Sequence, residues 1–130
     1  MTETGVRLVV DASALGAVFF RETDAERLEK KFLGRSLIAP TLIDYEVGSI
    51  YLKKLKTYPK LRQQLQECYR LFSRLALQRI DMEIAPLIAL AEQEGLSIYD
   101  ASYLGLATMM DAELLTLDKK LEKAWSRRVR

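Results

Sequence analysis

Two aspartates stand directly behind apolar runs that are typical of strands. Asp11 follows VRLVV, residues 6–10, and Asp118 follows ELLTL, residues 113–117. The first run has almost no polar alternation, which indicates a strand buried on both faces of a parallel sheet. Since the carboxyl ends of parallel strands meet at one edge of a sheet, we expect both carboxylates at that edge, where such folds bind their ligands.

Two further acidic positions belong to predicted helices. Asp100 stands in the first turn of the helix IYDASYLGLA, where free backbone N–H groups and the helix dipole favour an anion. Tyr103 follows one turn later, so the two side chains share a face that is expected to point inward. Glu46 borders an apolar stripe one turn from Ile43, but Asp44 borders the same stripe on its other side. Periodicity alone does not choose between Glu46 and Asp44.

Each acid also has a purely structural explanation. Asp11 fits a turn or a helix cap, Asp100 fits an N-terminal helix charge, and Asp118 fits the cap of a last helix. Three carboxylates at equivalent edges of one sheet are harder to explain in this way, because crowded carboxylates repel and raise each other's pKa. A bound cation relieves this repulsion, so the sequence predicts a metal site.

The available residue types indicate which metal and which chemistry. The chain has no histidine and one cysteine, Cys68, which excludes histidine-based triads, Cys–His pairs and zinc sites built on imidazole or several thiolates. A ligand set made only of oxygen selects Mg²⁺ or Mn²⁺. Either ion lowers the pKa of a bound water and polarises a phosphoryl oxygen, so we expect metal-assisted phosphoryl transfer or phosphodiester hydrolysis.

Composition predicts a single cytoplasmic domain over residues 1–130. The chain is 49% hydrophobic, and its lone cysteine can form no disulfide within it, which fits a reducing compartment. No apolar run approaches the roughly 18 residues of a membrane span. The N-terminal MTETGVR lacks the pattern of a signal peptide. A net charge of +2 is too small to indicate a nucleic-acid partner by itself.

Strands and helices are predicted to alternate along the chain. The predicted strands comprise residues 6–10, 36–40, 78–80 and 113–117, and the basic tail leaves room for one more. The predicted helices comprise residues 14–20, 23–34, 42–56, 60–77, 82–94 and 98–110, with Thr41 as the cap of the third. This alternation predicts an α/β fold with a mostly parallel central sheet covered by helices on both faces.

Four segments together resemble the PIN domain, and within it the VapC-like ribonuclease toxins of prokaryotic toxin–antitoxin pairs. They are VVDASAL (residues 9–15), APTLIDYEVGS (39–49), IYDASYLGLA (98–107) and LLTLDKKL (114–121). They occur in the family's order and spacing and span nearly the whole chain. The resemblance implies a three-layer fold in which helices flank a mostly parallel sheet of four to five strands.

The resemblance also implies which residues form the site. The family's acidic Mg²⁺ or Mn²⁺ site corresponds to Asp11, Glu46, Asp100 and Asp118. It therefore selects Glu46 over Asp44. Ser13 and Thr116 match small hydroxyl positions that support the site. Ser49, a third supporting position, departs from the asparagine that the family's helix often carries there.

The implied activity is endonucleolytic cleavage of RNA by metal-activated water. An antitoxin partner is also implied, one whose C-terminal segment lies over the active-site groove and blocks it, and many relatives form homodimers. Basic residues that could contact RNA phosphates are Arg21, Lys53, Lys54 and Lys56. The same charges fit a solvated helix face equally well.

Other functions remain open at this stage. A PIN-type nuclease could process RNA without an antitoxin, and a non-catalytic α/β binding module would use all four acids structurally. A phospho-accepting receiver domain also has acids at strand ends, but it requires an acidic pair after the first strand. Here a single Asp11 follows that strand.

Overall fold

A parallel sheet of four strands lies at the centre of the protein. The computed structural model describes residues 7–129, and in it the strands are β1 (Arg7–Val10), β2 (Ser36–Pro40), β3 (Leu77–Ile80) and β4 (Glu113–Leu115). Their order is β3-β2-β1-β4, and all three neighbouring pairs are parallel. The carboxyl ends of all four strands therefore meet at one edge.

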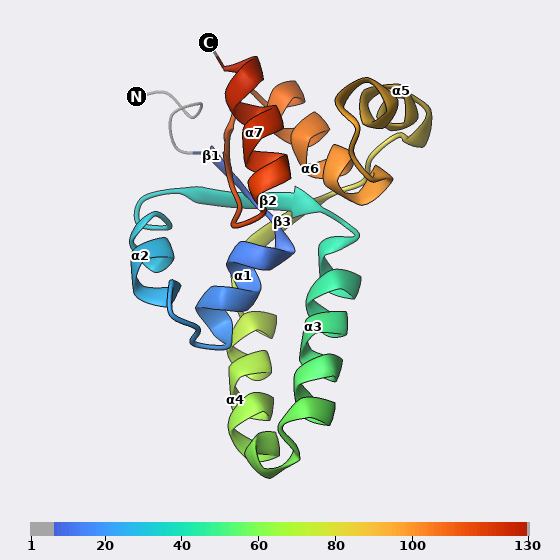
Figure 1. The fold of residues 1–130 in the computed structure, drawn as a ribbon. Coiled ribbons are helices and arrows are strands. Elements are labelled where there is room, and N and C mark those ends of the chain that lie inside the picture. Colours follow the sequence, from blue (N-terminus) through green and yellow to red (C-terminus); the bar gives the residue numbers. More distant parts are fainter. Residues whose placement is uncertain (1–6, 130) are drawn as a thin grey trace.

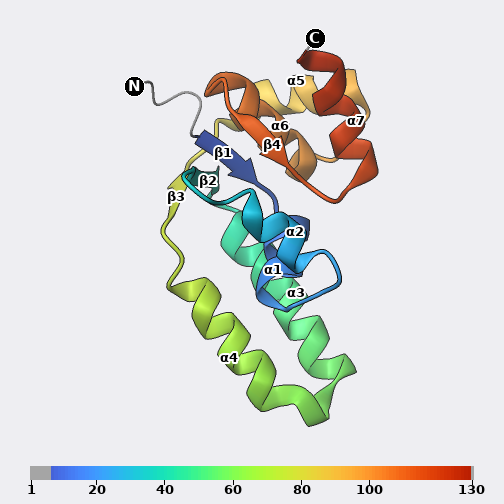
Figure 2. The same ribbon diagram turned by 90° about the vertical axis from the view of Figure 1, so that its left-hand side faces the viewer.

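Two layers of helices cover the sheet, one on each face (Figures 1 and 2). The N-terminal helical layer consists of α1 (Ala12–Phe19), α2 (Ala25–Lys30), α3 (Ile43–Thr57), the 3-10 helix η2 (Pro59–Leu61) and α4 (Arg62–Ser73). The C-terminal helical layer consists of α5 (Ile84–Glu94), α6 (Ile98–Met109) and α7 (Lys119–Arg128). The predicted three-layer α/β fold with a parallel sheet is confirmed.

Helices α3 and α4 form a hairpin that extends away from the sheet, with η2 at its tip (Figure 1). Aromatic rings hold the hairpin together, because Tyr51 of α3 stacks on Tyr69 of α4 with 4.6 Å between ring centroids. Phe20 stacks on the other side of Tyr51 at 6.0 Å. Glu46 stands in the first turn of α3, at the end of the hairpin that adjoins the sheet.

The core explains why the central strand is apolar on both faces. Leu8, Val9 and Val10 of β1 are completely buried, and Val9 pairs with Ile38 of β2 and Leu114 of β4. Helix α6 packs against this strand through a face of small and aliphatic residues, Ala101, Leu104 and Ala107. Burial of this apolar surface is the main stabilising contribution to the fold.

Several predicted helix boundaries differ from the observed ones, and three of the differences have clear local reasons. The first helix begins at Ala12 instead of residue 14, because the side chain of Asp11 caps it. Leu42, not Thr41, is the N-cap of α3, since the N–H of Thr41 donates to the carbonyl of Ile80. The helix predicted over 60–77 becomes η2 and α4 and ends at Ser73, because the chain must enter β3 at Leu77.

The sheet has four strands within the described residues, the lower number of the predicted four to five. The basic tail forms the helix α7 and adds no strand within the described residues, and Leu121 and Ala124 are buried at helical spacing on its inner face. Strand β4 ends at Leu115, two residues earlier than predicted, because Thr116 and the residue after it bind the site described below. Val6, the first residue of the predicted strand, lies outside the described residues.

No helix within residues 7–129 has the length and apolar character needed to cross a membrane.

Candidate active site

Asp11 is the most enclosed of the four predicted acids, with 4% of its surface exposed. It follows β1, and its carboxylate accepts three hydrogen bonds. Oδ1 accepts from the Ser13 hydroxyl at 2.7 Å and from the backbone N–H of Ala14 at 3.0 Å, and Oδ2 accepts from the Thr116 hydroxyl at 2.5 Å. Asp11 therefore caps α1 and also presents a buried carboxylate at the binding edge of the sheet.

Ser13 and Thr116 connect the ends of β1 and β4 through Asp11. Each hydroxyl donates its proton to Asp11 and accepts a backbone N–H, Ser13 from Leu117 and Thr116 from Asp118, both at 2.9 Å. Each hydroxyl thus uses its donor and an acceptor position at once. The two hydroxyls therefore bind both oxygens of the Asp11 carboxylate and orient it.

Asp118 is half-buried and caps α7, since its Oδ1 accepts the backbone N–H of Leu121 at 2.9 Å. Asp100 is also half-buried and stands in the first turn of α6, where the Ser97 hydroxyl accepts its backbone N–H at 3.0 Å. Burial raises the pKa of Asp100, and the charge of Asp118 raises it further, whereas Lys120 lowers it. Asp100 therefore experiences the charge of Asp118 directly.

Glu46 stands in the first turn of α3, and its Oε1 accepts the hydroxyl of Tyr103 at 2.6 Å. Burial raises the pKa of Glu46, the bond from Tyr103 lowers it, and the charges of Asp100 and Asp11 raise it again. Asp44, two residues earlier, binds the guanidinium of Arg79 at 2.7 and 2.8 Å. Glu46 therefore faces the other acids, whereas Asp44 forms an ion pair with Arg79 of β3.

The four acids form one electrostatic group. Burial raises the pKa of Asp11, its three hydrogen bonds lower it, and the charge of Asp100 raises it. Asp100 therefore interacts with Asp11, Glu46 and Asp118. All their donor atoms are carboxylate oxygens, the type that Mg²⁺ and Mn²⁺ prefer. Within residues 7–129, however, no three His, Cys, Asp or Glu side chains lie close enough together to hold one metal ion.

Two residues near the acids were not identified by sequence reasoning. Tyr103 fitted the hydrophobic core, and it is 1% exposed, but its hydroxyl binds Glu46. Lys120 lies at the start of α7 and lowers the pKa of Asp100. The one sequence signal for Tyr103 was its position one turn after Asp100.

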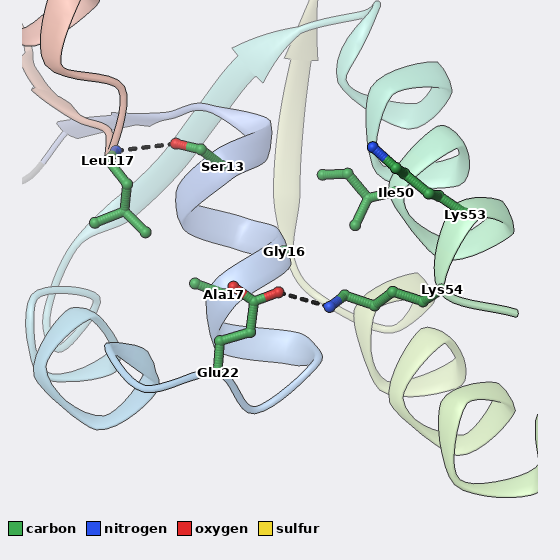
Figure 3. Close-up of a pocket in the computed structure, with 8 residues that line it drawn as sticks. All are labelled: Ser13, Gly16, Ala17, Glu22, Ile50, Lys53, Lys54 and Leu117. Carbon is green, nitrogen blue, oxygen red and sulfur yellow. Dashed lines mark hydrogen bonds and ion pairs between the residues drawn. The ribbon is translucent and has the colours of Figure 1, made fainter. Parts of the chain in front are cut away.

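A pocket of about 300 Å³ lies between α1 and α3 (Figure 3). Its lining residues are Ser13, Gly16, Ala17, Glu22, Ile50, Lys53, Lys54 and Leu117. Lys54 binds Glu22 at 2.7 Å, and Lys53 is exposed. None of the four acids lines this pocket, and Ser13 is its link to them, because Ser13 donates to Asp11.

The remaining predicted positions lie on the surface. Lys56 is exposed on α3, and Arg21 pairs with Glu29 at 3.5 Å just after α1. Ser49 is exposed on α3 and makes no side-chain hydrogen bond to another described residue. The structure therefore brings Ser13 and Thr116 into the site by direct contact, but not Ser49.

The fold and the acidic edge define an α/β domain whose sheet carries buried carboxylates at the strand ends. A family model, the PIN domain, matches residues 8–125. The chain therefore belongs to the PIN-domain family. The chain is also similar to several proteins named as ribonucleases. Ribonuclease VapC3 from Pyrobaculum aerophilum is 31% identical over 121 residues, which cover 89% of this chain and 92% of that one.

A second relative, Ribonuclease VapC9 from Mycobacterium tuberculosis, is 33% identical over 124 residues, which cover 88% of this chain and 87% of that protein. The predicted VapC-like character is confirmed by these relatives. The crystal structure of PAE2754 from Pyrobaculum aerophilum matches with a TM-score of 0.63 and 24% identity, over 95% of this chain and 96% of that one. That likeness establishes the fold alone.

Proposed function

We propose that this chain is an endoribonuclease that hydrolyses RNA phosphodiester bonds with Mg²⁺ or Mn²⁺ at the acidic edge of its sheet. The proposal rests on the placement of the four acids: Asp11 and Asp118 follow β1 and β4 and cap the next helices, and Glu46 and Asp100 stand in the first turns of α3 and α6. An all-carboxylate group at the ends of parallel strands suits a hard divalent cation, and the relatives that cover most of the chain are named ribonucleases.

The ion would be held by carboxylates of Asp11, Glu46, Asp100 and Asp118. When bound, it would supply an activated water and charge neutralisation at the phosphodiester. Among residues 7–129 no three of these side chains lie close enough together to hold one ion, so cation binding requires that carboxylates move. We infer that a cation draws them closer, a movement of side chains that the exposed part of the edge permits.

The protein's own residues prepare the site before RNA binds. Ser13 and Thr116 donate to both oxygens of Asp11 and fix its carboxylate, while the backbone of Ala14 adds a third donor. The remaining lone pairs of Asp11 stay available to a cation. Lys120 lies near Asp100 and could contact the substrate's phosphate from the other side of the edge.

The pocket between α1 and α3 offers a path for the RNA backbone. Lys53 and Lys54 line it, and Ser13 joins it to Asp11. Lys54 is already paired with Glu22, so Lys53 is the better candidate for a phosphate contact. Lys56 and Arg21 would extend this basic path, because both are exposed near the same helices.

An antitoxin and a second copy of the chain are the proposed protein partners. An antitoxin segment would cover the acidic edge and block it, as expected of a VapC-like toxin.

The homodimer proposal rests on α5, whose Ile84 and Ile88 are 58% and 56% exposed. Sedimentation of the wild type and Ile88→Glu tests the dimer, since a buried glutamate would separate the copies.

The test of the proposed activity is a matched pair of substitutions on α3. Glu46→Gln should abolish Mg²⁺-dependent cleavage of RNA, whereas Asp44→Asn, two residues earlier and engaged with Arg79, should retain it. Cleavage by Glu46→Gln at the wild-type rate would reject the assignment of Glu46. Loss of growth inhibition on expression of Asp11→Ala would link the same site to toxicity in cells.

A further inference from the structure

We propose that Tyr103 is a positioning residue, which fixes the Glu46 carboxylate at the acidic edge by a hydrogen bond between the two helical layers. This inference rests on the proposed function, because it gives Glu46 a role in cation binding. The proposal is based on the 2.6 Å hydrogen bond that the Tyr103 hydroxyl donates to Oε1 of Glu46.

The bond joins helices that lie on opposite faces of the sheet. Tyr103 belongs to α6 in the C-terminal helical layer, and Glu46 belongs to α3 in the N-terminal helical layer (Figure 1). Among the side-chain hydrogen bonds of residues 7–129, this one alone links a helix of one layer to a helix of the other. The position of Glu46 relative to Asp100 therefore depends on it.

Glu46 needs such a fixed partner more than Asp11 does. A glutamate has one more rotatable bond than an aspartate, so holding its carboxylate in place costs more side-chain entropy. Asp11 is held by three donors, whereas Tyr103 is the one side chain that donates to Glu46 within the described residues. The charges of Asp100 and Asp11 face Glu46 and oppose its inward position.

The donor type matters as much as its position. A lysine or arginine in the same place would neutralise the glutamate with a permanent positive charge and would compete with a cation. A tyrosine hydroxyl donates one hydrogen bond and brings no charge. Oε2 is left without this partner, so Glu46 keeps an oxygen and its negative charge for the ion.

Tyr103 itself is enclosed by the core. It is 1% exposed and belongs to the main hydrophobic core, one turn after Asp100 on the same helix. Because the ring is packed in the core, its hydroxyl holds the Glu46 side chain of α3 in place relative to α6. In this way one helix would supply a ligand, Asp100, and would also orient a ligand on another helix.

The test is Tyr103→Phe, which removes the hydroxyl and keeps the ring. Titration calorimetry with Mn²⁺ should give an affinity about 10–100-fold below that of the wild type, the usual cost of losing a partner of a metal ligand. With saturating Mg²⁺, kcat for RNA cleavage should fall while KM stays within about twofold, because Tyr103 does not contact RNA. The matched control is Tyr51→Phe, a stacked tyrosine on α3 five residues after Glu46.

A double-substitution cycle tests whether Tyr103 acts through Glu46. In a Glu46→Gln background, Tyr103→Phe should weaken Mn²⁺ binding by no more than about twofold further. An undiminished effect in that background would overturn the proposal, and so would wild-type Mn²⁺ affinity in Tyr103→Phe. Equal losses in Tyr51→Phe would indicate a general packing defect and would also reject it.

Crystal structures without metal provide an outcome that is independent of activity. The Glu46 carboxylate should be ordered against Tyr103 in the wild type and displaced from the acidic edge in Tyr103→Phe. An unmoved carboxylate in Tyr103→Phe would overturn the positioning role even if the wild type neither binds Mn²⁺ nor cleaves RNA. Failure of wild-type cleavage alone would reject the proposed function and leave the structural link to be judged by this comparison.

Discussion

The hydroxyl of Thr116 donates a 2.5 Å hydrogen bond to Oδ2 of Asp11, across 105 positions in the sequence. The bond ties the end of β4 to the end of β1. The N–H of Asp118 donates in turn to the same hydroxyl of Thr116 at 2.9 Å. One small hydroxyl therefore sets the geometry of two acids at once, and its removal is expected to affect both stability and activity.

Thr116→Val keeps the shape of the side chain but removes this donor. The buried carboxylate of Asp11 then loses a charge-assisted bond, so the free energy of unfolding should fall by about 1–3 kcal/mol. Urea denaturation at neutral pH measures this loss. The control is Thr108→Val on α6, whose hydroxyl bonds the carbonyl of Leu104 within its own helix. An equally small effect in both variants would contradict a special role for Thr116.

Stability without divalent metal should decrease as the pH rises above the ordinary carboxyl range. Burial raises the pKa of Asp11 above its ordinary value of 3.8, and Glu46 and Asp100 are raised as well. A raised pKa means that the folded state binds the proton more tightly than the unfolded state. The stabilisation is therefore present at low pH and is lost as the pH passes through the raised value.

Asp11→Asn isolates this effect, because it removes the most buried of the charges. The variant should show a flatter dependence of the unfolding free energy on pH than the wild type, with both measured in chelator. Asp111→Asn is the control, an exposed position after α6. If Asp11→Asn kept the wild-type slope, burial of the Asp11 charge would not be a source of instability.

Mg²⁺ or Mn²⁺ should raise the melting temperature of the wild type. An ion that binds only the folded state stabilises it by about 2.7 kcal/mol at one hundred times its dissociation constant. It also relieves the repulsion among the four carboxylates. Differential scanning calorimetry should detect the shift in the wild type and in Asp111→Asn, but not in Asp11→Ala. An equal shift in Asp11→Ala would place the ion elsewhere.

Lys53→Ala should weaken RNA binding in a salt-dependent manner. If Lys53 contacts one phosphate, its loss should reduce the slope of log affinity against log salt by about one. Binding to an RNA oligonucleotide in chelator measures this without cleavage. Lys123→Ala, on α7 in the C-terminal helical layer, is the control. An unchanged slope in Lys53→Ala would exclude the pocket between α1 and α3 as the RNA path.

Local patterns predicted the strand-end acids well. Asp11 and Asp118 follow apolar runs, and the rule that parallel strands end at one edge placed both correctly. Both residues also cap helices, so the structural and the functional explanations of these aspartates are compatible. A further strand in the tail after Asp118 was left open, and the three-residue spacing of Leu121 and Ala124 was the signal for a helix instead.

Contacts between distant residues could not be predicted from periodicity. Whether Glu46 or Asp44 faces the site depends on Arg79, which binds Asp44 from 35 positions away. The bond from Tyr103 to Glu46 spans 57 positions and joins two helices whose relative placement only the folded structure gives. Such pairs require tertiary geometry, and the resemblance to a family supplied the choice of Glu46 without supplying its partner.

RNA cleavage by two variants, Asp100→Asn in α6 and Asp111→Asn just after it, tests the central claim most directly. With Mg²⁺ present, the wild type and Asp111→Asn should cleave RNA, chelator should abolish cleavage, and Asp100→Asn should lose about 100-fold or more of the rate. Asp100 interacts with all three other acids, so its neutralisation should disturb the whole site. Full Mg²⁺-dependent cleavage by Asp100→Asn would contradict the account, because the acidic edge would then not be the catalytic site.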